Sequence, residues 1–337
     1  MSFGLRSPCV AAVVTLLASP LAAAAQPVAD FYKGKTVNVY IGVGVGGEYD
    51  IQARLVARHL GKHIPGNPTL VPQNMTGAGG LRMINYLYNV APKDGASIGM
   101  IANAFPAMQA AGIAGVMFDA AKMQWIGSIA PAVETMAVWS ATGVKNIDDA
   151  RSREVIAGAS ARGAITLIYP QMMNEFLGTK FKIVTGYPGG NQINLAMERG
   201  EVEARNNTWS SWKATKADWI RDKKITVIAQ AGPRAPDLDA PSVEDAARTP
   251  EERQLIELVV SGTQFGRPFA TNEAPADRVA ALRAAFAATM KDPEFLAEAK
   301  SLGFEVDPVL GDRMQKVVEK VLATPKDVAV KAKGLLE

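Results

Sequence analysis

Strand patterns and helix patterns alternate along residues 36–103, and this alternation constrains the fold more than any other feature of the chain. Residues 36–43 (TVNVYIGV) are β-branched and bounded by glycine, as in a buried strand. Residues 50–64 place apolar side chains on one helical face, with Asp50 as the expected N-cap. The expected order is strand 36–43, helix 50–64, strand 69–74, helix 81–91 and strand 96–103. Because helices separate the strands, we expect a parallel sheet with right-handed crossovers.

A second α/β series follows, and 337 residues are too many for one ordinary core. Further strands are expected at 124–130, 134–140, 153–160, 180–187, 202–209 and 224–232, with helices at 164–177, 190–201, 275–290, 293–302 and 311–323. The sequence therefore predicts two α/β lobes, joined by crossing strands near 125–130 and 258–268. Lobe 1 would comprise residues 26–127 and 258–337, and lobe 2 residues 128–257. A ligand would lie between them, at the carboxyl ends of the strands.

The first 25 residues are typical of a secretory signal peptide. Arg6 is their only charged residue, an apolar run extends from Cys9 to Ala25, and small residues precede the expected cleavage near Ala25. A membrane anchor is the alternative, but the run is short for a span. Cys9 is the only cysteine, so the mature chain would lack disulfides, thiol catalysis and cysteine-ligated metals. These features together predict a periplasmic protein.

Charge and motif spacing argue against nucleic acids and nucleotides. Without Arg6 the mature chain keeps 35 of the 36 basic residues against 33 acidic ones, which is no basic surface for nucleic acid but suits a small anion. Gly42, Gly44 and Gly47 match the dinucleotide spacing, yet the second strand ends in Gln73-Asn74, with no acid to bind ribose. The full P-loop pattern Gly-x-x-x-x-Gly-Lys-Ser/Thr is absent as well, because Gly34-Lys35-Thr36 has Ala29 where the first glycine of the pattern would stand.

The two histidines, His59 and His63, have the i, i+4 spacing that metal ligands use. No glutamate lies between them and no third ligand is evident, so we expect an exposed helix face and no metal. Without cysteine and without other histidines, most nucleophile–base pairs are also missing. The chain is therefore expected to be neither an enzyme nor a cofactor carrier.

Two glycine loops each open a predicted helix: GVGG before Asp50, and TGAGG (76–80) before Leu81. Helix starts offer free N–H groups and a partial positive charge, and glycine lets a ligand approach the backbone. Both loops are expected at one sheet edge, placed to converge on one anion; the alternative is two tight turns. The stretch GASARGA (158–164) adds Arg162, which either grips a carboxylate in bidentate fashion or is a solvated surface arginine.

These stretches, in this order, resemble a known family. Residues 31–60, NMTGAGG (74–80) and VTGYPGGNQINLAMERGEVEA (184–204) are similar to the periplasmic solute-binding receptors of tripartite tricarboxylate transporters, the Bug proteins. The resemblance covers nearly the whole mature chain. It implies a two-lobed type II periplasmic-binding-protein fold, the Venus flytrap, with two crossing strands.

The resemblance also implies which residues bind a small organic carboxylate. These are Gly46, Gly47, Tyr49 and Asp50 in the first loop, Thr76, Ala78 and Gly79 in the second, Asn103 after the third strand, and Ser160, Arg162, Tyr187 and Asn207 in lobe 2. Asn206-Asn207 replaces an acid common in the family, which makes an amino-acid ligand less expected. Trp209 and Trp212 either wall an aromatic ligand or pack in the core.

The function implied is capture of a small organic carboxylate and its delivery to membrane permease subunits, by a monomer that does no chemistry. Hinged lobes would close on the anion and shift the population to a form that the permease recognises. Two alternatives remain at this point. The chain is a sensor subunit that presents its ligand to a membrane kinase, or an exported enzyme that acts on carboxylates.

Overall fold

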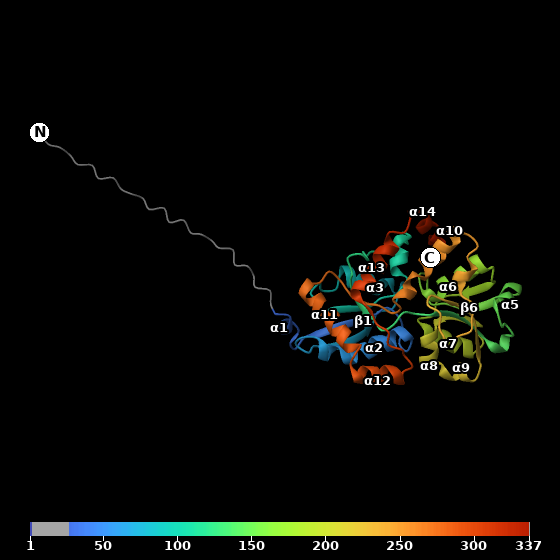
Figure 1. The fold of residues 1–337 in the computed structure, drawn as a ribbon, viewed down its shortest axis with the longest axis horizontal. Helices are drawn as coiled ribbons and strands as arrows, with labels where there is room; N and C mark the ends of the chain where they lie inside the picture. Colours follow the sequence, from blue (N-terminus) through green and yellow to red (C-terminus); the bar gives the residue numbers. More distant parts are fainter. Residues whose placement is uncertain (2–26, 337) are drawn as a thin grey trace.

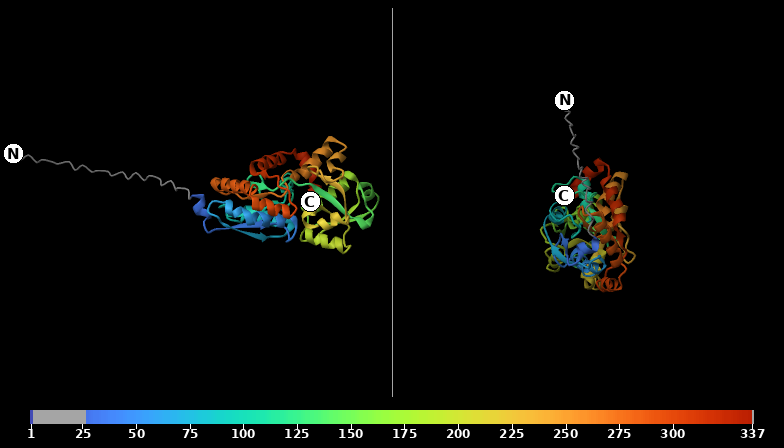
Figure 2. Two further views of the ribbon diagram at one scale, coloured as in Figure 1. Left: turned by 60° about the horizontal axis from the view of Figure 1, so that its bottom comes forward. Right: turned by 90° about the vertical axis from the view of Figure 1, so that its left-hand side faces the viewer.

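The computed structural model describes residues 27–336 together with Met1, so the expected signal peptide lies outside the described residues. Two α/β halves lie side by side along the longest axis (Figure 1). The first strands and helices form one half, the middle of the chain forms the other, and the C-terminal helices return over the first (Figure 2). Within the described residues, no helix is both long and apolar enough to cross a membrane.

The first sheet has six strands in the order β11-β4-β10-β3-β1-β2. Their bounds are β1 Thr36–Ile41, β2 Thr69–Asn74, β3 Ser97–Met100, β4 Gln124–Ser128, β10 Phe269–Thr271 and β11 Val309–Leu310. β1 pairs in parallel with both β2 and β3, as the β-α-β-α-β pattern predicts. β10 runs antiparallel to β3 and β4, and β11 antiparallel to β4. The sheet is therefore parallel on the side of the glycine loops and antiparallel on the other.

Helices cover the first sheet: α1 Val28–Tyr32, α2 Glu48–Leu60, α3 Leu81–Asn89, α4 Phe105–Ala110, α11 Ala276–Thr289, α12 Pro293–Ser301 and α13 Gly311–Leu322. Ile41 of β1, Leu55 of α2 and Phe286 of α11 are fully buried in one cluster. Burial of each such side chain contributes about 1.5–3 kcal/mol. A Cβ at Gly127 would lie 2.4 Å from the Phe286 ring, so glycine in β4 lets α11 pack directly on the sheet.

The second sheet has five strands in the order β7-β6-β8-β5-β9. Its strands are β5 Glu134–Trp139, β6 Val155–Gly158, β7 Phe181–Val184, β8 Ala204–Thr208 and β9 Ile225–Ala231, and its helices are α5 Ile147–Ser152, α6 Ile165–Leu177, α7 Gly190–Glu198, α8 Trp209–Thr215, α9 Ala217–Arg221 and α10 Pro250–Val260. β6 is parallel to β7 and β8, whereas β5 is antiparallel to β8 and β9. The tilted rings of Trp212 and Trp219 lie with their centroids 5.8 Å apart in the core, so Trp212 is a packing residue and does not line the cavity described below.

The chain passes between the sheets twice, and only the first passage leads from strand to strand. It crosses at 129–133, from β4 to β5. The strand expected at 258–268 is wrong: α10 runs to Val260 and a 3-10 turn, η5, covers Ser261–Gln264. Thr249 caps α10, because its hydroxyl accepts a hydrogen bond from the Glu252 amide. The lobe boundaries stay a prediction.

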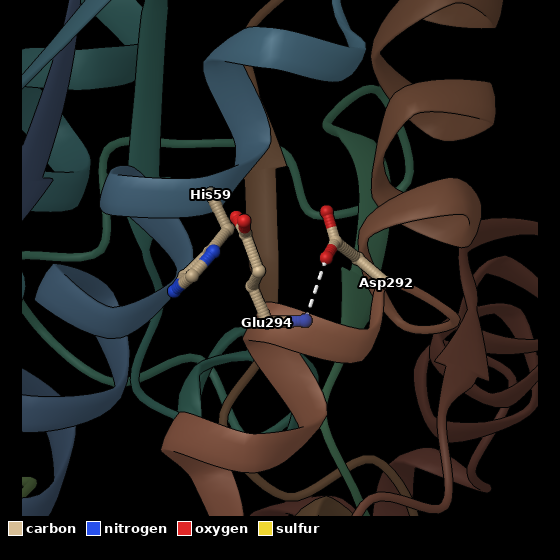
Figure 3. A group of neighbouring side chains, drawn as sticks. All are labelled: His59, Asp292 and Glu294. Atoms are coloured by element: carbon tan, nitrogen blue, oxygen red, sulfur yellow. Dashed lines mark hydrogen bonds between the residues drawn. The ribbon is translucent and has the colours of Figure 1, made fainter.

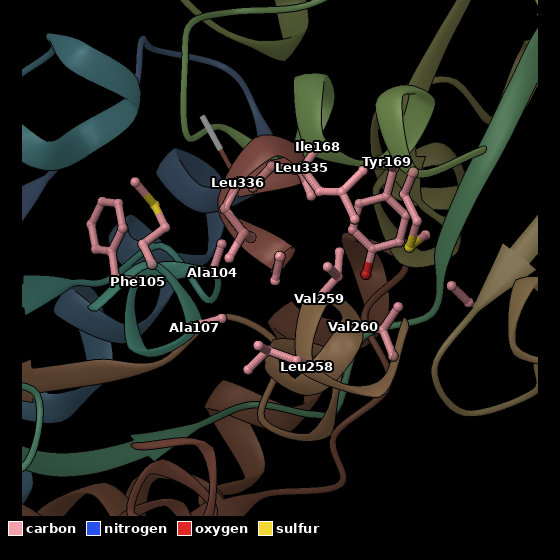
Figure 4. Close-up of a cluster of buried hydrophobic side chains, with 14 of the residues drawn as sticks. Ala104, Phe105, Ala107, Ile168, Tyr169, Leu258, Val259, Val260, Leu335 and Leu336 are labelled. Atoms are coloured by element: carbon pink, nitrogen blue, oxygen red, sulfur yellow. The ribbon is translucent and has the colours of Figure 1, made fainter. Parts of the chain in front are cut away.

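The final helix, α14 Lys326–Leu336, was not expected from the sequence and packs against elements of both halves. It contacts α10, α4 and α6. Its end, Leu335 and Leu336, lies buried in one cluster with Phe105 of α4, Ile168 of α6 and Val259 of α10 (Figure 4). The C-terminus therefore ties the first half of the molecule to the second.

Candidate functional site

A cavity of about 360 Å³ lies between the two sheets, at the carboxyl ends of β1 and β2. Its wall combines the two glycine loops of the first half with loops and β8 of the second. Nine of the twelve residues expected at a ligand site line it, namely Gly46, Gly47, Tyr49, Thr76, Ala78, Gly79, Ser160, Tyr187 and Asn207. Asp50, Asn103 and Arg162 do not line it.

Backbone amides form one wall of this cavity. α2 begins at Glu48 with Gly47 as its N-cap residue, and the first-turn amides of a helix have no acceptor within it. In the second loop the N–H groups of Gly77, Ala78 and Gly79 have no hydrogen-bond acceptor within residues 27–336. Gly77, Ala78, Gly79 and Gly80 all have positive φ, an arrangement that glycine adopts readily and that Ala78 (φ 47°) adopts at a cost. The two loops therefore present free donors to one space.

Asp50 is not the N-cap that the sequence suggested, because it lies inside the first turn of α2 and is buried. Its Oδ2 accepts from the Gly46 amide at 3.0 Å, and its Oδ1 accepts from Arg54 Nε at 3.0 Å and Asn74 Nδ2 at 2.9 Å. Burial opposes the charged carboxylate, but the hydrogen bonds from Arg54, Gly46 and Asn74 outweigh it and lower the pKa of Asp50. Asp50 therefore holds the first glycine loop in place by hydrogen bonding and does not itself line the cavity.

Asn103 acts in the same indirect way. It is buried after β3, and its backbone amide donates to the Tyr49 hydroxyl at 3.3 Å. Tyr49 in turn lines the cavity, with its ring 4.2 Å from the guanidinium of Arg267. Asn103 therefore positions a wall residue and does not contact the cavity.

Arg162 is exposed and does not point a charge at the cavity. Its carbonyl oxygen instead lies against the first half, 2.6 Å from where a Cβ on Gly79 would stand. The GASARGA loop still supplies Ser160, whose hydroxyl pairs with Thr166 at 3.0 Å. The strand–loop–helix segment therefore contributes Ser160 to the cavity wall, whereas Arg162 lies outside that wall.

Arg205 of β8 provides the positive charge that the sequence reading missed. It is 4% exposed and lines the cavity. Its Nε donates to the Asn206 carbonyl at 3.0 Å, and its Nη1 donates to the Gly190 carbonyl at 2.5 Å and to Asn194 Oδ1 at 2.7 Å. Its Nη2 has no hydrogen-bond partner within residues 27–336, and no carboxylate there lies within ion-pair distance. Arg205 is therefore a buried cation with free donors.

The charge on Arg205 persists at neutral pH. Burial lowers the pKa of its guanidinium to about 9, while Glu134 and Glu48 oppose that shift and Arg267 adds to it. The side chain also lies 5.3 Å from the Trp212 ring, which offers a favourable cation–π contact. Because an isolated buried charge is unfavourable, the Arg205 guanidinium favours an anion in this cavity.

A second buried cluster joins the halves beside the cavity. Arg267 donates to Glu48 Oε2 at 2.8 Å and to Glu134 Oε1 at 3.2 Å. Glu48 also accepts from the hydroxyl of Ser210 at 2.5 Å and from that of Thr208. Burial raises the pKa of Glu134 despite the adjacent Arg267, and its Oε2 has no partner among the described atoms. No sequence signal links these residues, because they are far apart in the chain.

The glycine loops also let the two halves approach closely. The Gly44 amide donates to the Pro188 carbonyl at 3.3 Å, across the rim of the cavity. A Cβ on Gly189 would lie 3.3 Å from the Gly44 nitrogen, and one on Gly79 would collide with the Arg162 carbonyl. The glycines therefore permit close contact between the two halves as well as access to the backbone, which was not expected from the sequence.

Comparison with known proteins gives the fold. No family model and no curated protein matches this chain. The periplasmic binding protein BugD superposes with a TM-score of 0.70 at 19% identity, covering 89% of this chain and 98% of that one. R. palustris Rpa4515 with adipate gives 0.69 at 19%, covering 89% and 97%. MatC (Rpa3494) from Rhodopseudomonas palustris with bound malate gives 0.68 at 16%, covering 90% and 99%. The predicted fold of two-lobed periplasmic binding proteins is confirmed.

Proposed function

We propose that this chain is a periplasmic receptor that captures a small organic carboxylate between its lobes and delivers it to a tripartite tricarboxylate transporter. The observation that carries the proposal is Arg205, a buried guanidinium on the cavity wall with a free Nη2 and no carboxylate partner within the described residues. A carboxylate is the partner that matches a guanidinium in charge and shape. The similar folds that hold adipate and malate support the same class of ligand.

The donors lie on opposite walls, and this suggests how binding is coupled to closure. Free amides of the loops at 47–49 and 77–79 belong to the first half, whereas Arg205 belongs to the second. An anion that contacts both walls binds the closed arrangement more tightly than the open one, so it shifts the population toward closure. The closed form is then what a permease recognises. Periplasmic location, delivery to a permease and a monomeric state belong to this proposal.

Arg205→Gln tests the proposal. Glutamine keeps a polar side chain in β8 but removes the charge, so affinity for a bound dicarboxylate should fall about 100-fold, or ~2.7 kcal/mol. Calorimetric titration with adipate and malate, after a thermal-shift screen of organic acids, measures this change. Arg162→Gln is the matched control and should bind normally, because Arg162 is exposed and outside the cavity wall.

Two experimental outcomes would contradict the proposal. Equal losses in Arg205→Gln and Arg162→Gln would remove the assigned role of Arg205. Turnover of a carboxylate by the wild-type protein would replace the receptor function with an enzymatic one.

A further inference from the structure

Both histidines of the chain face the start of α12, away from the ligand cavity. His59 lies in α2 and His63 in the 3-10 turn η1 (Gly61–His63) that follows it. His59 Nε2 is 2.6 Å from Glu298 Oε2, and His63 Nε2 is 2.7 Å from Asp292 Oδ2. The exposed helix face expected from the sequence is wrong for His59, which is 8% exposed. The sequence shows no third ligand because the carboxylates lie more than 220 residues further along the chain.

Three side chains here offer the ligand atoms that zinc prefers. One atom each from His59, Asp292 and Glu294 lies within 4.8 Å of the other two. They come from two packed elements, α2 and the start of α12, and their side chains gather in the space between these helices (Figure 3). Imidazole nitrogen and carboxylate oxygen are ordinary zinc ligands, and three protein ligands plus water complete a tetrahedral site.

Two of these side chains are held in place before any ion binds. Asp292 is 8% exposed and caps α12, because its Oδ1 accepts from the Glu294 amide at 2.9 Å (the dashed line in Figure 3). The His59 ring packs edge-on against Phe295 with centroids 5.7 Å apart. Glu298 and His63 orient His59 and Asp292 from the outside, as partners around metal ligands do.

The carboxylates around the cluster outnumber the permanent cations, and this excess of negative charge favours a bound cation. Three carboxylates, Asp292, Glu294 and Glu298, face two permanent cations, Arg58 and Lys62. Lys62 Nζ lies 2.6 Å from both Asp292 Oδ2 and Glu294 Oε2, and so occupies the place that an ion would take. The Lys62 side chain is 41% exposed, so its flexible stem can turn the ammonium out to solvent.

We propose that the α2–α12 interface is a binding site for a divalent zinc-type ion, with His59, Asp292 and Glu294 as ligands and Lys62 as the competing cation. The bound ion joins the C-terminal segment to α2, whose first turn carries Glu48 and the amides of the cavity wall. The site is separate from the ligand cavity and does not depend on the function proposed for it.

Calorimetric titration of the mature protein with ZnCl2 tests this site, with MgCl2 as the control ion. Wild-type protein should bind one zinc and no magnesium. Lys62→Met should bind zinc about ten-fold more tightly, because it removes the competing ammonium. His59→Gln should abolish binding, and His63→Gln should weaken it about ten-fold, the lower end for a residue that orients a ligand.

Two further variants separate metal binding from folding. Asp292→Asn keeps a good N-cap residue for α12 while removing the ligand charge, so it should fold normally and lose zinc. Glu257→Gln changes an exposed acid of α10 and should bind as the wild type does. Absence of zinc binding in the wild type overturns the proposal, even where Lys62→Met binds, since the cluster is then only an ion-pair network. Wild-type binding that survives His59→Gln overturns it as well.

Discussion

Arg267→Met should destabilise the protein strongly, because Arg267 is the only cation that contacts two buried carboxylates among the described residues. Glu48 and Glu134 have side-chain exposures of 3% and 0%, and that of Arg267 is 4%. Methionine has a similar length but no charge, so both carboxylates remain buried without a counter-charge. Removing one partner of a buried pair typically costs about 3–5 kcal/mol. In a chain of this size, that corresponds to a fall in Tm of about 5–8 °C.

The loss should depend on pH in a definite direction. Burial raises the folded-state pKa of Glu134 above its usual value, so the folded state binds more protons than the unfolded state in the interval between these pKa values. Stability therefore falls as pH rises through that interval. Removing Arg267 raises the pKa of Glu134 further, so Arg267→Met should lose more stability relative to wild type at pH 8 than at pH 5.

Thermal denaturation of both proteins at pH 5 and pH 8, followed by circular dichroism, measures the effect. Arg267→Met combined with Glu48→Gln and Glu134→Gln is the matched control, because it removes all three charges and keeps the side-chain volumes. The triple variant should recover most of the lost Tm. A fall of less than 2 °C in the single variant, or the same fall at both pH values, would refute the assigned electrostatic role.

Substitutions at two glycines give further predictions, one about ligand affinity and one about closure. In Gly190→Ala the new Cβ would lie 2.8 Å from Arg205 Nη2, so the guanidinium must shift and dicarboxylate affinity should fall about ten-fold with little change in Tm. Calorimetry checks this, and unchanged affinity would mean that the position of Arg205 is unimportant. In Gly79→Ala the new Cβ would collide with the Arg162 carbonyl at a residue with φ of 63°, so the halves should stay apart. Small-angle scattering should then show no compaction with ligand; compaction equal to that of the wild type would contradict a role for Gly79 in closure.

Local patterns predicted the fold well where side-chain periodicity was unambiguous. Residues 36–41 and 48–60 carry their own strand and helix patterns, and parallel pairing follows from their alternation. The expected strand at 258–268 failed because a short apolar run, Leu255–Val260, suits a buried strand or a buried helix, and the capping Thr249 lies outside that run. α14 contains Gly334 near its end, a residue that disfavours a helix, and the elements that it packs against are distant in sequence.

The cavity wall was predictable only where residues that are close together in the sequence build it. Both glycine loops lie directly between a strand and a helix, so their approach to one space follows from sheet topology. The cluster of Glu48, Glu134 and Arg267 depends instead on three distant segments, as does the grouping of His59 with Asp292. Charged residues of this kind look solvated in a sequence, because their partners appear only after folding.

Arg205 shows what signal the sequence did contain. β8 lies in the centre of its sheet, between β6 and β5, and all five of its residues are buried. A central strand normally carries apolar side chains, yet four of these five are polar: Arg205, Asn206, Asn207 and Thr208. Buried polar groups need partners, and the protein satisfies Arg205 Nε and Nη1 but leaves Nη2 without one among the described residues. A polar run inside a predicted central strand therefore points to a ligand more directly than an arginine in a loop.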